Sequence, residues 1–264
     1  MRRHRIALQG SRLIAGRSLA DPVQDRAQWS GKCDVVIIGG GIVGTCVALY
    51  LAERGVDVVL LEKGVVAGEA SGRAVGFIDS VMMAREKQEA IRCSKALWAD
   101  LDRRCGGAPG YRQSGLVFAL RQPSELEAAA AWIDRLGPDT DARLLTPPET
   151  ERMLPGTDAA QYRGALHMPS DGHADPRRAA PAIAREAIRL GARLFQNCAA
   201  RRIATHEGRV RGVETERGLI RCEQVVVAAG VWASLLVRRL GVDVPQLYGF
   251  ATASEVGSAP LPAQ

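Results

Sequence analysis

The hydrophobic residues of this chain fall into two kinds of pattern. Short apolar runs without polar alternation occupy residues 34–38, 56–62 and 223–230, which is typical of strands buried on both faces of a parallel sheet. Between the first two runs, a mainly apolar stretch over residues 42–54 predicts a helix. It is followed by Gly55, a residue suited to a left-handed cap. Together these segments predict a compact β-α-β unit.

The middle of the chain has more mixed patterns. Residues 84–104 and 124–136 have the character of helices, the first with apolar residues along one face, and residues 115–120 form a strand candidate. Thr146 and Glu149 match a capping box, which predicts the start of another short helix.

A longer helix is predicted to begin after Asp175. Asp175 is a natural N-cap, Pro176 fits the first helical position, and Gly191 suits the far end. Pro181 falls inside this helix and should kink it, because its nitrogen cannot donate to the preceding turn. Short strand patterns follow at residues 193–195, 199–205, 209–215 and 218–222. Buried strands that alternate with a mixed middle predict an α/β fold with an inserted second region.

The charge of the chain argues against nucleic acid as a partner. The net charge is +6, but six arginines and two aspartates in the first 27 residues account for +4 of it. The remainder is near neutral and shows no basic stripe with interleaved aromatic residues.

Two stretches of the chain have features of targeting or membrane segments. The Arg-rich start of the chain has the character of an organelle transit peptide, but a disordered extension or a misassigned start explains residues 1–32 more simply. Residues 35–52 carry no charge and reach the length of a membrane span. Glycines interrupt that run where a strand must turn into a helix, so we predict no transmembrane segment. The six cysteines are scattered without metal or disulfide spacing, which favours a reduced, cytoplasmic setting.

The first strand, turn and helix carry a nucleotide-binding motif. Gly39, Gly41 and Gly44 form G-x-G-x-x-G, which permits a tight turn, lets a pyrophosphate approach the backbone and lets the helix pack on the strand. The helix N-terminus then favours the phosphate charge. Glu62 ends the second strand, where a carboxylate can accept both ribose hydroxyls and disfavours NADP. This unit alone leaves NAD and FAD open.

The loop "GEASGRAVG" at residues 68–76 helps to choose between them. Its small residues allow close backbone approach, while Ser71 and Arg73 can hydrogen-bond to phosphate or ring oxygens. A flexible surface loop is the simpler alternative for such a glycine content.

Three ordered segments resemble the D-amino acid oxidase superfamily of FAD-dependent amine oxidoreductases. They are "DVVIIGGGIVGTCVALYLAERGVDVVLLEK" with "GEASGRAVG", then "DGHADPRRAAPAIAREAIRLGA", then "VVVAAGVWASLL". The resemblance implies a Rossmann-like FAD-binding domain with an inserted mixed α+β substrate domain. It assigns cofactor contacts to Gly39, Gly41, Gly44, Glu62, Lys63, Ser71, Arg73, Ala200, Gly230 and Trp232. Some relatives attach FAD through a histidine where this chain has Arg73, so the resemblance implies non-covalent FAD.

The resemblance also implies the reaction. A hydride would leave the carbon next to the nitrogen of a small-molecule amine or amino acid (a D-amino acid, a secondary amino acid or an opine-like compound) and pass to flavin N5. The cofactor carries this chemistry, and the sequence indicates no catalytic residue. The four histidines form no triad and no metal cluster pattern, so we predict no metal.

Members of this family continue past the segment that resembles "AAGVW". We therefore expect an incomplete substrate domain and a second subunit that completes the active site. The alternatives are a non-catalytic fragment or a nucleotide-binding subunit that needs a partner chain and, as a weaker one, an NAD-dependent dehydrogenase. The expected divisions are an extension (1–32), FAD-binding parts (33–82 and 166–240), a first substrate-domain part (83–165) and the truncated start of a return to that domain (241–264).

Overall fold

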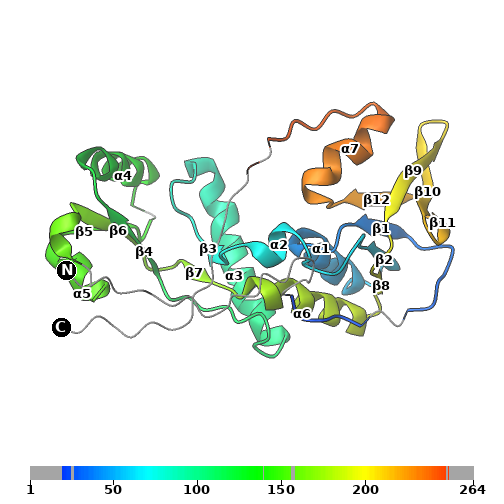
Figure 1. The fold of residues 1–264 in the computed structure, drawn as a ribbon, viewed down its shortest axis with the longest axis horizontal. Helices are drawn as coiled ribbons and strands as arrows, with labels where there is room; N and C mark the ends of the chain where they lie inside the picture. The colour runs from blue at the N-terminus through cyan, green and yellow to red at the C-terminus, as the bar shows by residue number, and fades with distance from the viewer. Residues whose placement is uncertain (1–19, 25–26, 139, 156–157, 248, 250–264) are drawn as a thin grey trace, which may run out of the picture.

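The computed structural model describes residues 20–24, 27–138, 140–155, 158–247 and 249 of the chain. One part of the fold is built on a four-stranded sheet in which all neighbouring strands run parallel (Figure 1). In spatial order the strands are β12 (Gln224–Val227), β1 (Val35–Ile38), β2 (Val58–Leu61) and β8 (Arg193–Phe195). The predicted parallel sheet is confirmed, and β1 and β2 are buried along their whole length.

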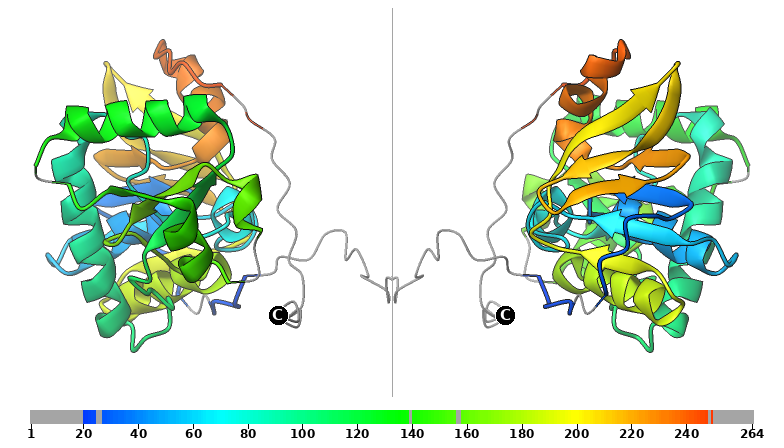
Figure 2. Two further views of the ribbon diagram at one scale, coloured as in Figure 1. Left: turned by 90° about the vertical axis from the view of Figure 1, so that its left-hand side faces the viewer. Right: turned by 90° about the vertical axis from the view of Figure 1, so that its right-hand side faces the viewer.

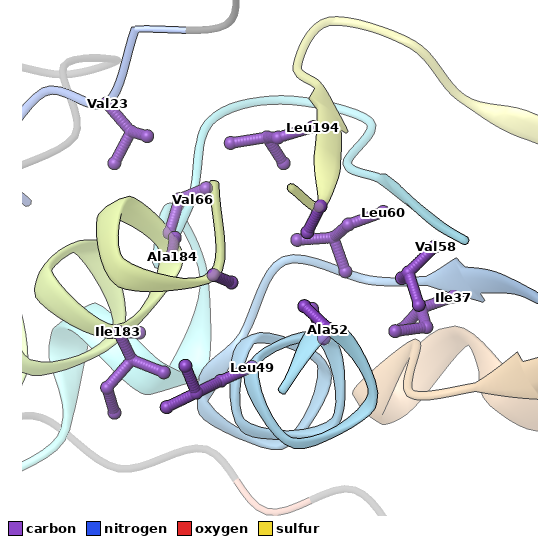
Figure 3. Close-up of a cluster of buried hydrophobic side chains, with 14 of the residues drawn as sticks. Val23, Ile37, Leu49, Ala52, Val58, Leu60, Val66, Ile183, Ala184 and Leu194 are labelled. Atoms are coloured by element: carbon purple, nitrogen blue, oxygen red, sulfur yellow. The ribbon is translucent and has the colours of Figure 1, made fainter. Parts of the chain in front are cut away.

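The two faces of this sheet are covered by different layers. Odd-numbered residues of β1, such as Ile37, pack with helices α1 (Ile42–Ala52) and α6 (Pro176–Arg189). Figure 3 shows this cluster, with Leu49 and Ile183 on the two helices. Even-numbered residues such as Val36 pack instead with an antiparallel sheet. Its strands are β9 (Ala200–His206), β10 (Arg209–Thr215) and β11 (Gly218–Arg221). We call these layers together the nucleotide unit.

A second unit lies beside the first. Its antiparallel sheet has the order β4 (Leu116–Leu120), β6 (Gly164–Met168), β5 (Arg143–Leu145). Helix α4 (Pro123–Leu136) covers one face through Trp132, which packs with Leu166 and Met168. Helix α5 (Pro147–Met153) begins with the predicted capping box of Thr146 and Glu149.

A two-stranded ribbon and a helix join the two units. Strands β3 (Phe77–Ile78) and β7 (Gly172–His173) pair as an antiparallel ribbon, and helix α3 (Gln88–Arg104) runs between the two units (Figures 1 and 2). The remaining short helices are α2 (Ala70–Arg73), α7 (Ala233–Val237), η1 (Arg85–Lys87), η2 (Ala159–Gln161), η3 (Gly230–Trp232) and η4 (Arg238–Leu240). No helix in the described parts of the chain combines the length and apolarity that crossing a membrane requires.

Part of the expected N-terminal extension packs on the nucleotide unit. Val23 is buried, the Asp21 N–H donates to the Arg177 carbonyl (2.9 Å), and the rings of Trp29 and Phe195 lie 5.1 Å apart. Residues 20–24 and 27–32 are therefore ordered against the fold, and residues 1–19 and 25–26 lie outside the described residues.

One detail differs from the sequence expectations, and the kink at Pro181 stays a prediction because the bounds of its helix do not measure a bend. The strand that includes Val225–Val227 was expected to be fully buried, but these residues are only half-buried. β12 lies at one end of the strand order, beside β1. Helix α6 continues through Pro181 as one element. The carbonyl of Arg177 is four residues earlier, and the Asp21 N–H donates to it in place of the hydrogen that proline lacks.

Candidate cofactor site

The turn between β1 and α1 has no room for side chains at two glycines. Gly39 has φ +115°, and a Cβ placed there would lie 2.4 Å from the Ala228 carbonyl oxygen. A Cβ on Gly44 would lie 1.9 Å from the Gly39 carbonyl oxygen, so α1 packs directly on the turn. The first and third motif glycines are therefore fixed by backbone packing, as their spacing predicts.

The N-terminus of α1 has no cap from its own N-cap residue. Its N-cap is Gly41, which has no side chain to accept from the first helical N–H groups. The Ile42 N–H donates instead to the Ser71 hydroxyl oxygen (3.0 Å), and a Cβ on Gly41 would lie 2.9 Å from that oxygen. Ser71 thus stands at the helix terminus, where the dipole favours a phosphate.

Glu62 at the end of β2 is a buried carboxylate. Its Oε2 accepts from the Gly40 N–H (2.8 Å), and its Oε1 accepts from the Gly64 N–H (2.7 Å). Both oxygens therefore tie the end of the strand to neighbouring backbone. A carboxylate has about four lone-pair sites, so each oxygen keeps acceptor capacity for a ribose hydroxyl.

Lys63 and Trp232 are in contact beyond the carboxyl ends of β2 and β12. The Lys63 Nζ lies 4.1 Å from the centroid of the Trp232 ring and 2.5 Å from Glu69 Oε1. Gly230 has φ +51° at the start of η3, which carries Trp232. The contact joins the loop after β2 to the turn after β12, two segments far apart in the sequence.

Arg73 and Ala200 are placed differently. The Arg73 guanidinium donates from Nε and Nη2 to the Gly68 carbonyl (3.2 and 3.0 Å) and is 70% exposed. Ala200 is half-buried on β9, against the apolar cluster beneath the sheet that includes Phe195. Their contact with a nucleotide stays a prediction.

A cavity of about 330 Å³ adjoins the turn. Ile42 and Ser71 line it on the side of α1, and Trp98 lines it on the side of α3. The rest of the lining is apolar or glycine, from residues 74–78, Ala174, Pro176, Ala179 and Ala180. Such a lining suits the apolar part of a small-molecule ligand.

The structure also shows a buried polar cluster that the sequence did not reveal. Lys95 on α3 forms an ion pair with Asp171, whose side chain is fully buried. Asp171 also accepts from the N–H and hydroxyl of Ser80 (3.0 and 2.9 Å), and Lys95 donates to the Ser170 hydroxyl (2.9 Å). Burial raises the pKa of neighbouring Asp79, and the charge of Asp171 adds to this. Asp171 lies within "DGHADP", where only Asp175 was marked, as a helix cap.

These residues fit an adenine dinucleotide. The glycine turn brings α1 directly against its backbone, the helix end lacks a side-chain cap from Gly41, and Glu62 has acceptor capacity beside it. A cavity that is large enough for part of a ring system lies next to the turn. In the described residues no group of acidic, histidine or cysteine side chains could hold a metal ion.

Comparisons with known proteins point the same way. Residues 34–260 match the profile of a family described as "FAD dependent oxidoreductase" (DAO). The chain is similar to human mitochondrial dimethylglycine dehydrogenase, with 29% identity over 250 residues that cover 90% of this chain and 28% of that protein. It is also similar to the mitochondrial pyruvate dehydrogenase phosphatase regulatory subunit of Mus musculus, with 28% identity over 76% of this chain and 23% of that protein.

Among solved structures, the fold is similar to L-amino acid deaminase from Proteus myxofaciens in complex with anthranilate. The TM-score is 0.78 and the identity 36%, over 87% of this chain and 52% of that one. The chain thus spans about a quarter of these two curated relatives and about half of the solved one.

Proposed function

Because the chain belongs to the DAO family of FAD-dependent oxidoreductases, whose cofactor is FAD, we propose that it binds FAD non-covalently and takes part in oxidising the C–N bond of an amino acid or related amine. The carrying observation is the glycine turn with its helix N-terminus and adjacent Glu62. When bound, FAD supplies the two-electron acceptor.

The residues of this chain divide the work of holding the cofactor. The first N–H groups of α1 and the Ser71 hydroxyl would hold the pyrophosphate, and Glu62 would accept from the adenosine ribose. Lys63 and Trp232 fix the adjoining edge. Arg73 occupies the position at which relatives with covalent FAD have a histidine. A permanently charged guanidinium is a poor nucleophile, which supports non-covalent binding.

The substrate class follows from chemistry shared by the similar proteins. Dimethylglycine and L-amino acids, the substrates named for two of them, both carry an amine and a carboxylate on one carbon. We therefore propose an α-amino acid or an N-alkylated derivative, with D-amino acids and opine-like compounds in the same class. The chain spans about half of its solved relative, and a second subunit that contributes to the substrate site stays a prediction.

A second candidate function is a nucleotide-binding subunit without catalysis. The observation in its favour is the similarity to a protein that is named a regulatory subunit. The two candidates share the cofactor site and differ only in whether an amine reduces the bound flavin.

The visible absorption spectrum of the purified chain, recorded before and after heat denaturation, tests the proposal. Flavin bands that move into the supernatant on denaturation support non-covalent FAD, and bands that stay with the pellet show covalent attachment. Anaerobic bleaching by one amine of a panel identifies an oxidoreductase, whereas bound flavin that no amine bleaches favours the regulatory subunit. A colourless protein that takes up no added FAD contradicts both functions.

A further inference from the structure

One buried amide lies between the N-terminal segment and the loop that follows β2. We call residues 20–24 the strap and residues 63–69 the cofactor loop. Gln196, directly after β8, is only 8% exposed. Its Oε1 accepts from the Val66 N–H (2.8 Å), and its Nε2 donates to the Val23 carbonyl (2.7 Å). The side chain therefore joins the strap to the cofactor loop through these two hydrogen bonds.

The cofactor loop rests directly on the glycine turn. Ala67 has φ +57°, a left-handed conformation that is unfavourable for a residue with a Cβ. Its N–H donates to the Gly40 carbonyl (3.0 Å), and a Cβ on Gly72 would lie 2.1 Å from the Ala67 carbonyl oxygen. Val66 and Ala67 are both buried. The strained backbone is thus held between the turn on one side and α2 on the other.

The loop is also fixed at its start. The Gly64 N–H donates to Glu62, whose other oxygen accepts from Gly40, and the Asn197 N–H donates to the Gly64 carbonyl (2.8 Å). Gln196 and Asn197 are consecutive, so one short segment after β8 holds the cofactor loop at two points. Figure 3 shows Val23 and Val66 gathered with Ala184 of α6 in one apolar cluster.

From this geometry we propose that Gln196 is a positioning residue for the FAD site. It holds Val66, and through it the strained Ala67, so that Gly40 and Glu62 keep the arrangement that receives the nucleotide. Through Val23 it couples the strap to the same loop. The inference rests on FAD binding as proposed above, but the positioning of the loop exists in the protein without FAD and can be measured there.

Three variants of the full chain separate the parts of this proposal. Gln196→Leu removes both hydrogen bonds. Gln196→Glu keeps an acceptor for the Val66 N–H but, when ionised, has no donor for the Val23 carbonyl. Thr150→Val is the matched control, because Thr150 is fully buried and its hydroxyl donates to the Thr146 carbonyl (2.9 Å) in α5 of the second unit.

Hydrogen exchange of the apoprotein and FAD titration are the two measurements. We expect Gln196→Leu to speed amide exchange in residues 63–69 and to raise the FAD dissociation constant about tenfold, because the Val66 N–H in the cofactor loop loses its acceptor. Gln196→Glu should speed exchange in the strap but leave the cofactor loop closer to the wild type. Thr150→Val should lower the melting temperature but change neither the amide exchange of residues 20–24 and 63–69 nor the FAD dissociation constant.

Two results would overturn the proposal. One is a Gln196→Leu protein that loses stability, as the control does, while exchange in residues 63–69 stays at the wild-type rate. The other is a faster loop with unchanged FAD affinity. If the wild type binds no FAD, the proposed function fails, whereas the exchange data still decide whether Gln196 holds the loop.

Discussion

At the scale of single residues, the glycine turn gives the sharpest prediction. Gly44→Ala places a Cβ 1.9 Å from the Gly39 carbonyl oxygen, so α1 must move away from β1. We expect a loss of stability of about 1–3 kcal/mol, as for other overpacked sites, and loss of FAD binding in a fluorescence titration. Gly31→Ala is the control, because its Cβ meets only the Leu219 carbonyl oxygen at 3.7 Å. Equal FAD affinity in both variants would contradict this account.

Single residues also show what sequence reasoning can reach. The glycines and Glu62 could be predicted because their roles depend on a strand, a turn and a helix adjacent in the sequence. Gln196 and Lys95 were missed because their partners are far away. Val66 lies 130 residues from Gln196, and Asp171 lies 76 residues from Lys95. No local spacing records such pairs, and only the packed fold brings them together.

The buried thiol of Cys33 should lower the free energy of unfolding at alkaline pH. Burial, with a further contribution from nearby Cys222, raises the pKa of this thiol from 9.0 to about 12. Between those values the unfolded chain releases the proton while the folded chain keeps it, so stability is complete below about pH 9 and falls as the pH rises. Cys33→Ala should flatten the decline of the melting temperature between pH 9 and 11. Removal of exposed Cys93 in the same way should leave the slope unchanged.

At the scale of elements, α6 depends on its N-cap. Asp175 accepts from the Arg177 N–H (2.9 Å), and Pro176 follows at the first helical position. Asp175→Ala should lower the free energy of unfolding by about 1 kcal/mol in urea denaturation, with an unchanged slope. Asp175→Ser supplies another capping oxygen and should recover most of the loss. A serine variant as unstable as the alanine variant would show that the carboxylate acts through its charge rather than as a cap.

Elements with strong local signals were predicted closely, whereas the burial of one strand was not. The helix that follows Asp175 and the capping box at Thr146 are predicted from caps alone, and both are confirmed. Val225–Val227 of β12 are as apolar as β1, yet they are only half-buried. At the other end of the strand order, Leu194 and Phe195 of β8 are buried, so neither apolar composition nor edge position alone encodes how far the rest of the chain covers a strand.

At the scale of the whole molecule, the Lys95 and Asp171 cluster sits where the chain passes between the two units. Ser80 follows β3 as the chain leaves the nucleotide unit, and Asp171 precedes β7 as it returns. Lys95 of α3 joins the same cluster through its ion pair with Asp171. Buried ion pairs add little against apolar replacements of the same shape, but the loss of one partner leaves a charge uncompensated. The cluster therefore acts mainly to fix how the units meet.

This role predicts how FAD stabilises the molecule. In the wild type, FAD should stabilise the folded protein by about 2.7 kcal/mol when its concentration is 100 times the dissociation constant. The temperature of a single cooperative melting transition should rise accordingly. Lys95→Met strands the buried Asp171 carboxylate and should cost about 3 kcal/mol. It should also separate the melting of the second unit, so that calorimetry shows two transitions and FAD raises only one. The double variant with Asp171→Asn removes the stranded charge and should regain part of the loss. If Lys95→Met melts in one FAD-sensitive transition, the units are held together by the β3–β7 ribbon and α3 packing without the ion pair.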